Sequence, residues 1–271
     1  MAVTRQMVGT AVAALAICAG TAHADPIGWP QPDGPGSPVY LTYSYSNLLD
    51  SSFNTVLTPA ELRAATEAAF MLWASYAPLH FIETHTYGPA ASETDYPAAG
   101  TANIRIGQLS ALADGAVAHV HLPFARDGGA TGLSGDIHFS NDLSLAGYQT
   151  WGRASDGALV LDFFSAMLHE AGHATGLLHL LGATAIMGNA LHIFPDHETA
   201  DLFPADIAAI RALYGAGVGS VRPLADTAVP TPEPASVLLI VTGLGACGVG
   251  ARRRRRARHP EELCRVKPWP G

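Results

Sequence analysis

The stretch that decides the fold reads His169-Glu170-Ala171-Gly172-His173-Ala174-Thr175-Gly176-Leu177-Leu178-His179. Histidines four residues apart lie on one face of a helix, about 40° apart around its axis, so both imidazoles can reach one metal ion. His179 joins them only if the chain turns back, and Gly176 permits the positive φ of such a turn. Three neutral imidazoles leave the fourth position of tetrahedral zinc open, which is typical of a catalytic site. Glu170 is placed to act as its general base.

The plain alternative is that these histidines merely occupy a helix and its exit turn. A bare His-Glu-x-x-His pattern arises by chance in unrelated proteins, but here five positions in eleven are fixed. The longer pattern therefore favours a zinc site with His169, His173 and His179 as ligands.

The rest of the body predicts a mixed α/β domain. Strands are expected at residues 39–45, 79–83 and 102–106, with two more between 116 and 140 around a glycine-rich turn. Three helices are expected: from Pro59 to before Pro78, from an Asp162 N-cap to about Leu178, and from Pro204 to Tyr214. The first is the clearest, because Thr58, Pro59 and Glu61 form an N-cap, a first-turn proline and a capping-box glutamate.

Composition and charge bound the class of protein. A chain of 271 residues with 48% apolar content can bury one core and still carry short signals at both ends. All three cysteines lie outside residues 25–246, so no disulfide holds the body together and no thiol in it can bind a metal. Residues 25–251 hold six basic residues against 21 carboxylates, which argues against a nucleic-acid partner.

The N-terminus has the pattern of an export signal. Arg5 precedes an apolar run and small residues that end at Ala24, so residues 1–24 are predicted to be a cleavable signal peptide handled by the export machinery. Residues 25–37, rich in proline and glycine, are predicted to be a loose lead-in to the first strand.

The C-terminus carries a second signal. After a predicted linker at 217–231, the segment 232–258 contains Pro232-Glu233-Pro234, then 17 uncharged apolar or small residues (235–251), then Arg252–Arg256. The apolar run is near the lower limit for a transmembrane helix.

The segment 232–258 resembles the PEP-type sorting signals that exosortases of exopolysaccharide-producing Gram-negative bacteria recognise. The resemblance implies transient membrane insertion, cleavage near Pro232-Glu233-Pro234, and a final location at the cell envelope, the cell surface or outside the cell. A plain membrane anchor is the alternative, and residues 259–271 have no explanation.

The zinc motif resembles the metzincin signature, and Ala185-Ile186-Met187 resembles the Met-turn of that clan. Within the clan the chain is most similar to the matrixins. Segments that resemble matrixin segments, in the same order, are Tyr43, the Thr58 helix, Phe81, Gly135–Phe139, Asp206-Ile207 and Leu213–Gly215. The resemblance covers residues 38–216 and implies an α/β (α+β) zincin fold. Its parts are a twisted, mostly parallel five-stranded sheet, three helices and a zinc cleft across one domain, with Met187 packed beneath the zinc.

The resemblance also implies an activity. Matrixins are zinc-dependent endopeptidases that hydrolyse protein or peptide substrates through a metal-activated water. Gly188-Asn189 replaces the Tyr-Pro pair that commonly follows the Met-turn methionine, so substrate preference stays open. Two alternatives remain: a surface structural or adhesive module in which zinc only stabilises the fold, and a metzincin of another subfamily, such as the astacin-like or serralysin-like enzymes.

Further metals are implied by the same resemblance. Matrixins carry a structural zinc on three histidines and an aspartate, and the candidates for a second metal here are His119, His138 and Asp136. The alternative is that His119, His121 and His138 are ordinary strand residues with hydrogen-bond partners. Asp127, Asp136 and Asp142 lie near several glycines and are candidates for Ca²⁺, with solvated loop carboxylates as the alternative.

Overall fold

The computed structural model describes residues 28–85, 88–94, 101–123, 133–194 and 197–224. Its larger sheet has six strands in the order β4-β5-β3-β1-β2-β8. These are β1 (Val39–Tyr45), β2 (Leu79–Glu83), β3 (Ile104–Leu109), β4 (Ala118–Val120), β5 (Ile137–Ser140) and β8 (Ser220–Arg222). All neighbours are parallel except β4, which runs antiparallel to β5 at one edge. The predicted mostly parallel sheet is confirmed.

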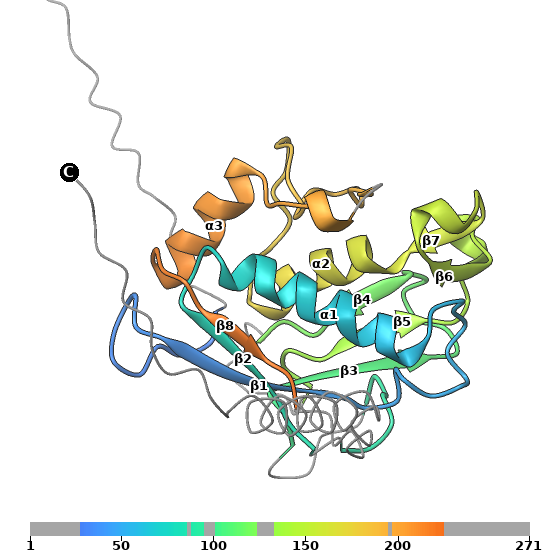
Figure 1. The fold of residues 1–271 in the computed structure, drawn as a ribbon, viewed down its shortest axis with the longest axis horizontal. Coiled ribbons are helices and arrows are strands. Elements are labelled where there is room, and N and C mark those ends of the chain that lie inside the picture. Colours follow the sequence, from blue (N-terminus) through green and yellow to red (C-terminus); the bar gives the residue numbers. More distant parts are fainter. Residues whose placement is uncertain (1–27, 86–87, 95–100, 124–132, 195–196, 225–271) are drawn as a thin grey trace, which may run out of the picture. The chain divides into compact units, whose positions relative to one another are not determined.

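Three α-helices accompany this sheet, as predicted: α1 (Pro59–Ala74), α2 (Phe163–Ala174) and α3 (Pro204–Tyr214). In Figure 1, α1 and α2 lie side by side over one face of the sheet. A short parallel pair, β6 (Thr150–Gly152) and β7 (Val160–Asp162), leads directly into α2. The core lies between the helices and the sheet, where Trp73 of α1 is fully buried and donates a hydrogen bond to the Leu168 carbonyl of α2 at 2.9 Å.

The start of α1 follows the predicted capping chemistry. The Glu61 amide donates to the Thr58 hydroxyl at 3.3 Å, and the Thr58 amide donates to the Glu61 carboxylate at 2.8 Å. Two of the amides that a helix start leaves unpaired are thereby satisfied. The hydrogen bond from the Thr58 amide, followed by those from the Arg153 guanidinium and the Thr58 hydroxyl, lowers the pKa of the Glu61 carboxyl to about 2.

Helix α2 ends at Ala174, four residues earlier than predicted. Gly176 takes φ +100°, the Leu177 amide donates to the Gly172 carbonyl at 3.1 Å, and the Gly176 amide donates to the His173 carbonyl at 2.8 Å. This pair of bonds is the Schellman arrangement, in which a left-handed residue reverses the chain at a helix end. The reversal that the zinc motif requires therefore occurs at Gly176, as expected, and only the end of the helix comes earlier than predicted.

The sixth strand was not predicted. Residues 217–231 were expected to be a linker, and this is wrong for β8, which pairs with β2 in the register Phe81–Val221. Without it, β2 would leave a row of backbone amides and carbonyls unpaired at the edge of the sheet. The approach is close at Gly219, where a Cβ would overlap the Leu79 carbonyl. The compact unit thus continues to Leu224.

The lead-in to β1 is anchored rather than loose. The Trp29 indole N–H donates to the Ala174 carbonyl at 2.8 Å, and the Trp29 amide donates to the Tyr214 hydroxyl oxygen at 2.9 Å. The Ala174 carbonyl is one of the four that the end of α2 leaves unpaired within the helix. The segment before β1 therefore supplies a hydrogen bond to the C-terminal end of α2, the helix that carries the zinc motif.

Several predicted segments lie outside the described residues: the signal peptide 1–24, residues 225–231, the sorting segment 232–258 with Pro232, Glu233 and Pro234, the tail 259–271, and Asp127. Across the part of the chain that the structure describes, no helix has the length and apolar character needed to cross a membrane.

Candidate metal centres

The three histidines of the zinc motif, here named the helix triad, converge as their spacing predicts. His169 and His173 project from α2, and His179 follows the Gly176 turn. The Nε2 atom of His179 lies 3.2 Å from that of His169 and 3.1 Å from that of His173. Tetrahedral zinc with bonds of about 2.1 Å separates its ligand atoms by about 3.4 Å. The three nitrogens therefore fit a zinc ion between them.

The outer ring nitrogens fix which atoms face the metal position. His169 Nδ1 lies 2.7 Å from the Ile186 carbonyl oxygen, and His173 Nδ1 lies 2.7 Å from the Leu177 carbonyl oxygen. A carbonyl only accepts hydrogen bonds, so each Nδ1 carries the proton and each Nε2 presents its lone pair. Metal-binding histidines are typically oriented by such outer partners.

Burial keeps both helix histidines in the form that binds metals. It lowers the pKa of His173 to about 4, with the neighbouring His169 adding to the effect. It also lowers the pKa of His169, against the opposing effect of the Ile186 carbonyl. Both imidazoles are therefore neutral at pH 7, with no proton to displace before a metal binds.

Glu170 lies next to the triad, with 7% of its surface exposed. Its Oε2 atom has no hydrogen-bond partner within the described structure. Burial, and secondarily the charge of Asp114, raises the pKa of Glu170 to about 8. A buried carboxylate oxygen without a hydrogen-bond partner lowers the stability of the fold. Groups of this kind are found at functional sites, where a ligand or substrate supplies the missing interaction.

Met187 lies under α2, where the Met-turn resemblance places it. Its side chain is fully buried, and a Cβ on Gly172 would overlap the Met187 sulfur. Gly172, inside the zinc motif, is therefore the residue that lets the methionine pack directly against the helix. The Leu180 amide donates to the Met187 carbonyl at 2.7 Å, so the same turn also holds the chain just after His179.

Asp206 was not predicted as a site residue, yet it holds the Met-turn in place. This fully buried carboxylate at the start of α3 accepts hydrogen bonds from the amides of Ile186 at 2.7 Å and Met187 at 3.0 Å. The Ile186 carbonyl in turn orients His169. The only sequence signal was the Asp206-Ile207 resemblance, which gave no role to the carboxylate.

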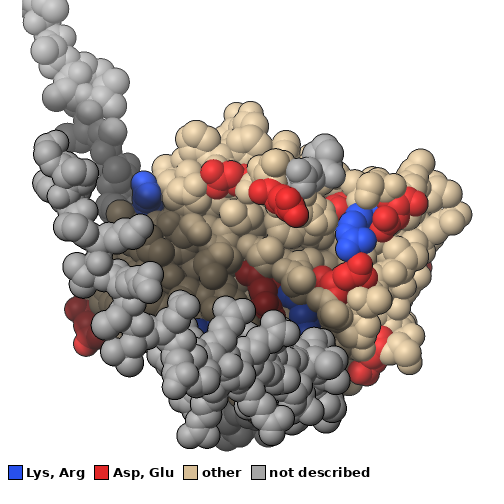
Figure 2. Space-filling model, viewed as in Figure 1, with Lys and Arg blue, Asp and Glu red and all other residues tan. Residues whose placement is uncertain are grey.

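The triad lies in a cleft between α2 and the edge strand β4. Its opposite wall is formed by Asp114, Ala116, Ala118, His119, Val120 and Leu122. Among the described residues, none of those that line the cleft is a lysine or arginine. On the face of the molecule seen in Figure 2, acidic side chains cover more of the surface than basic ones. The outer edge of β4 has no strand partner among the described residues.

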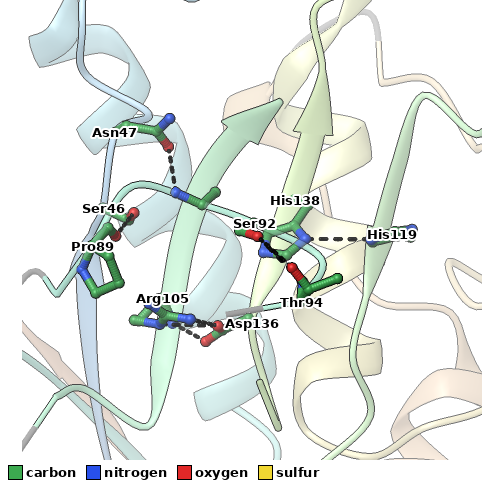
Figure 3. A network of polar contacts seen from close by, with 10 residues as sticks. Ser46, Asn47, Pro89, Ser92, Thr94, Arg105, His119, Asp136 and His138 are labelled. Atoms are coloured by element: carbon green, nitrogen blue, oxygen red, sulfur yellow. Dashed lines mark hydrogen bonds and ion pairs between the residues drawn. The ribbon is translucent and has the colours of Figure 1, made fainter. Parts of the chain in front are cut away.

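A second histidine group, here named the strand triad, consists of His119, His121 and His138, whose ligand atoms all lie within 4.8 Å of one another. Residues 119 and 138 are directly paired between β4 and β5, and residues two apart on an extended chain face the same side. His119 Nε2 and His138 Nδ1 are 3.4 Å apart, the contact drawn as a dashed line in Figure 3. The His121 Nε2 atom is buried and has no hydrogen-bond partner in the described structure.

The structure does not bring Asp136 to the strand triad. Its carboxylate accepts hydrogen bonds from Arg105 Nε at 2.9 Å, Arg105 Nη2 at 2.6 Å and the Arg105 amide at 3.0 Å (Figure 3). Arg105 is 2% exposed, and a buried guanidinium needs a paired carboxylate. His121 stands where Asp136 was expected, and the alternation of His119 and His121 along one strand was the available signal.

The candidate calcium ligands have other partners as well. Asp142 accepts hydrogen bonds from the Ser144 amide at 3.0 Å and the Ser144 hydroxyl at 2.6 Å, while Asp136 pairs with Arg105. Neither belongs to a group of potential metal ligands among the described residues. A calcium site stays a prediction without structural support.

Comparison with known proteins decides the family. The matrixin family model matches residues 37–215. The chain belongs to the matrixin family. This assignment favours matrixins over the other metzincin subfamilies considered above, and the family implies zinc, for which the helix triad is a candidate site.

Named relatives agree with this assignment. The chain is 28% identical to matrix metalloproteinase-18 of Xenopus laevis over 237 residues, which is 85% of this chain and 45% of the relative. It is 30% identical to matrix metalloproteinase-C of Caenorhabditis elegans over 188 residues, 66% of this chain and 28% of the relative. Human neutrophil collagenase is 28% identical over 213 residues, 74% of this chain and 38% of the relative. The matches thus span less than half the length of these relatives.

Proposed function

We propose that this matrixin is a zinc-dependent endopeptidase, with His169, His173 and His179 as zinc ligands and Glu170 as general base. One observation carries the proposal: the Nε2 atom of His179 lies 3.1–3.2 Å from those of His169 and His173, beside a buried carboxylate oxygen that has no hydrogen-bond partner among the described residues. A site that only stabilised the fold would have no use for that carboxylate.

Zinc at this position would supply Lewis-acid chemistry, polarising the scissile carbonyl and lowering the pKa of water. Glu170 takes the proton of the attacking water and returns it to the leaving amine. Its raised pKa suits the second step, and a nearby cation favours the ionised form that the first step needs. No covalent bond forms between substrate and protein.

Protein or peptide chains are the proposed substrates because of the shape of the cleft. The unpaired outer edge of β4 offers backbone amides and carbonyls to an extended peptide, which can add to the sheet as a further strand. The residues that line the cleft along this edge, Ala116, Ala118 and Val120, are small or apolar. Backbone pairing would then hold the scissile bond over the helix triad.

The direct test is Glu170→Gln in the purified chain, assayed on casein and on fluorogenic peptides. Hydrolysis is expected to fall by at least about a thousandfold while the zinc content stays unchanged, because only the base is lost. Glu198→Gln, the same chemical change at an exposed glutamate, should leave both unchanged. Undiminished hydrolysis in Glu170→Gln would refute the mechanism, and an inactive wild type that still binds zinc would favour the structural-module alternative.

We also propose that the strand triad binds a second divalent cation. The His119–His138 separation of 3.4 Å matches the spacing of ligand atoms around zinc, and the buried His121 Nε2 lacks a partner. Metal analysis should find two equivalents per chain, and loss of one equivalent in His138→Ala would assign it. A single equivalent in the wild type would refute this site.

We further propose export with processing at both ends: removal of residues 1–24, and exosortase cleavage near Pro232-Glu233-Pro234 after transient membrane insertion of residues 235–251. The support is the order of motifs in the sequence, a proline-rich element followed by an uncharged run and five arginines. Intact mass of the protein recovered from the cell surface or medium of a Gram-negative host tests it. A mature mass that includes Arg252–Arg256 would exclude the sorting step and leave a retained anchor.

A further inference from the structure

Two carboxylates line the cleft of the helix triad, on opposite walls. Glu170 lies beside the metal position, and Asp114 lies on the wall formed by β4 and the turn before it. The Asp114 side chain is 55% exposed, so a molecule bound in the cleft can reach it. Within the described part of the lining, the polar groups nearest to Asp114 in the chain are the Ala116 amide and the His119 imidazole, and neither carries a permanent positive charge.

The turn before β4 holds the Asp114 carboxylate in place and in its charged form. Oδ1 accepts a hydrogen bond from the Ala116 amide at 2.9 Å, and Oδ2 lies 3.2 Å from His119 Nδ1. The bond from the Ala116 amide, only partly opposed by burial, lowers the pKa of the Asp114 carboxyl below its usual value. An ionised carboxylate has about four acceptor sites, so both oxygens can still accept hydrogen bonds from a ligand.

The charge of Asp114 acts on the centre of the cleft. After burial, this charge is the second cause of the raised pKa of Glu170. The two carboxylates therefore repel each other across the cleft, and a cationic group placed beside Asp114 would reduce that repulsion. A positively charged side chain of a substrate is favoured at this wall for the same reason, and a negatively charged one is disfavoured.

The nearby carboxylate of Glu93 has a different position. Its Oε1 atom accepts a hydrogen bond from the Ala113 amide at 3.1 Å and lies 4.0 Å from His119 Nε2, the ring nitrogen that faces His138. Glu93 is not among the described residues that line the cleft. Its charge therefore faces the strand triad, where it offsets the cation proposed there, and leaves Asp114 as the anionic group of this cleft wall.

We infer that Asp114 selects peptide substrates that carry a lysine or arginine side chain, by pairing its carboxylate with the ammonium or guanidinium group. The inference rests on the proposed peptidase function. Asp114 lies four residues before Ala118, the first residue of β4, and both line the cleft. A peptide that adds to the edge of β4 therefore passes the Asp114 carboxylate at one end of that strand.

The composition of the chain fits such a preference. Residues 25–251 contain no lysine, and their six basic residues are all arginines. Three of these arginines form ion pairs with carboxylates of the same domain: Arg63, Arg105 and Arg153. A domain with so few basic side chains is a poor substrate for another copy that selects them, which protects an exported peptidase from cleavage by its own kind.

The experiment measures kcat/KM of the full chain on fluorogenic peptides that carry lysine at one position at a time, each paired with a peptide carrying uncharged norleucine there. The wild type should prefer lysine by about fivefold at one position or more, the effect of a partly exposed ion pair. Asp114→Asn should abolish this ratio, and Asp114→Lys should reverse it. Asp33→Asn, the same change at an exposed aspartate outside the cleft, should retain the wild-type ratio.

The ratio isolates the charge, because a disturbance that reaches the cleft through His119 lowers the hydrolysis of both peptides of a pair. Should Asp114→Asn lose its zinc or fail to fold, Asp114→Glu should keep the preference, and about 1 M salt should reduce it in the wild type. Equal rates for every pair in the wild type, or a preference that survives in Asp114→Asn or in high salt, would overturn the inference and leave the peptidase proposal intact. A zinc-loaded wild type that cleaves no peptide would overturn both.

Discussion

The two histidine triads differ in how the chain assembles them. The helix triad comes from eleven consecutive residues, brought together by one helix and the turn that ends it. The strand triad comes from two strands that meet only through their sheet register, and the carboxylate of Glu93 approaches it from a separate loop. Local geometry therefore specifies the first group, whereas the second depends on long-range pairing.

The supports of the two groups differ in the same way. The helix triad is oriented by backbone carbonyls close to it in sequence or in the Met-turn, at Leu177 and Ile186. The strand triad is flanked by the carboxylates of Asp114 and Glu93. Backbone carbonyls carry no net charge, whereas the two carboxylates add negative charge that a bound cation neutralises. Metal loss is therefore expected to disturb the strand triad more than the helix triad.

The largest effect is expected when one histidine of either triad is replaced by alanine. His173→Ala should remove the metal of the helix triad and lower peptide hydrolysis by at least about a thousandfold, because Lewis-acid activation is lost. The second equivalent should remain. His138→Ala should show the reverse metal pattern. His192→Ala, an exposed histidine outside both triads, should bind both metals as the wild type does. Loss of both metals in either ligand variant would show that the centres are not independent.

The next effect concerns the tertiary support of the helix triad. Asp206→Asn places an amide N–H₂ group against the amides of Ile186 and Met187, which both donate to the carboxylate. Leaving buried donors unpaired should lower the free energy of unfolding by about 3 kcal/mol. Urea denaturation measures it, with Asp201→Asn, at an exposed position, as the control. A loss under about 0.5 kcal/mol would mean that the Met-turn holds its place without Asp206.

A smaller effect is expected inside the zinc motif itself. Gly172→Ala should gain about 1 kcal/mol of helix propensity, yet its Cβ would overlap Met187 and approach the Trp73 ring. Overpacking of this kind costs about 1–3 kcal/mol, so we expect a net loss of about 1 kcal/mol. In a double-mutant cycle with Met187→Ala, that loss should disappear. A stabilised Gly172→Ala variant would show that the methionine moves freely.

The smallest effect concerns the pH dependence of stability at the start of α2. Asp162 caps α2, which carries the helix triad, and burial would raise its pKa, but hydrogen bonds from His197 and from the Ser165 amide lower it below its usual value. A depressed folded pKa stabilises the protein above the unfolded value of about 3.9, and this contribution is lost as pH falls through the folded pKa. The urea midpoint should therefore fall between about pH 5 and pH 3, and less steeply in Asp162→Asn. Equal slopes would contradict the role of this cap.

Sequence reasoning succeeded wherever the determining residues are neighbours in the chain. Thr58, Pro59 and Glu61 predicted the start of α1, and the bounds of β1, β2 and α3 match the expected residues. It failed where a distant partner decides. Arg105, brought by β3, takes the carboxylate of Asp136 away from the histidines. β8 becomes a strand because it pairs with the edge of β2. Its three residues follow several glycines and have no strand pattern of their own.

The sequence by itself determined the helix triad, its glycine turn and the carboxylate beside His169, because helical periodicity and left-handed glycine act over a few residues. Only the tertiary structure decided that His121 joins His119 and His138, that Glu93 lies beside them, and that Asp206 holds the Met-turn. These contacts join residues that are distant in the chain. Sheet register and buried charge pairing select them, and both arise only when the whole domain packs.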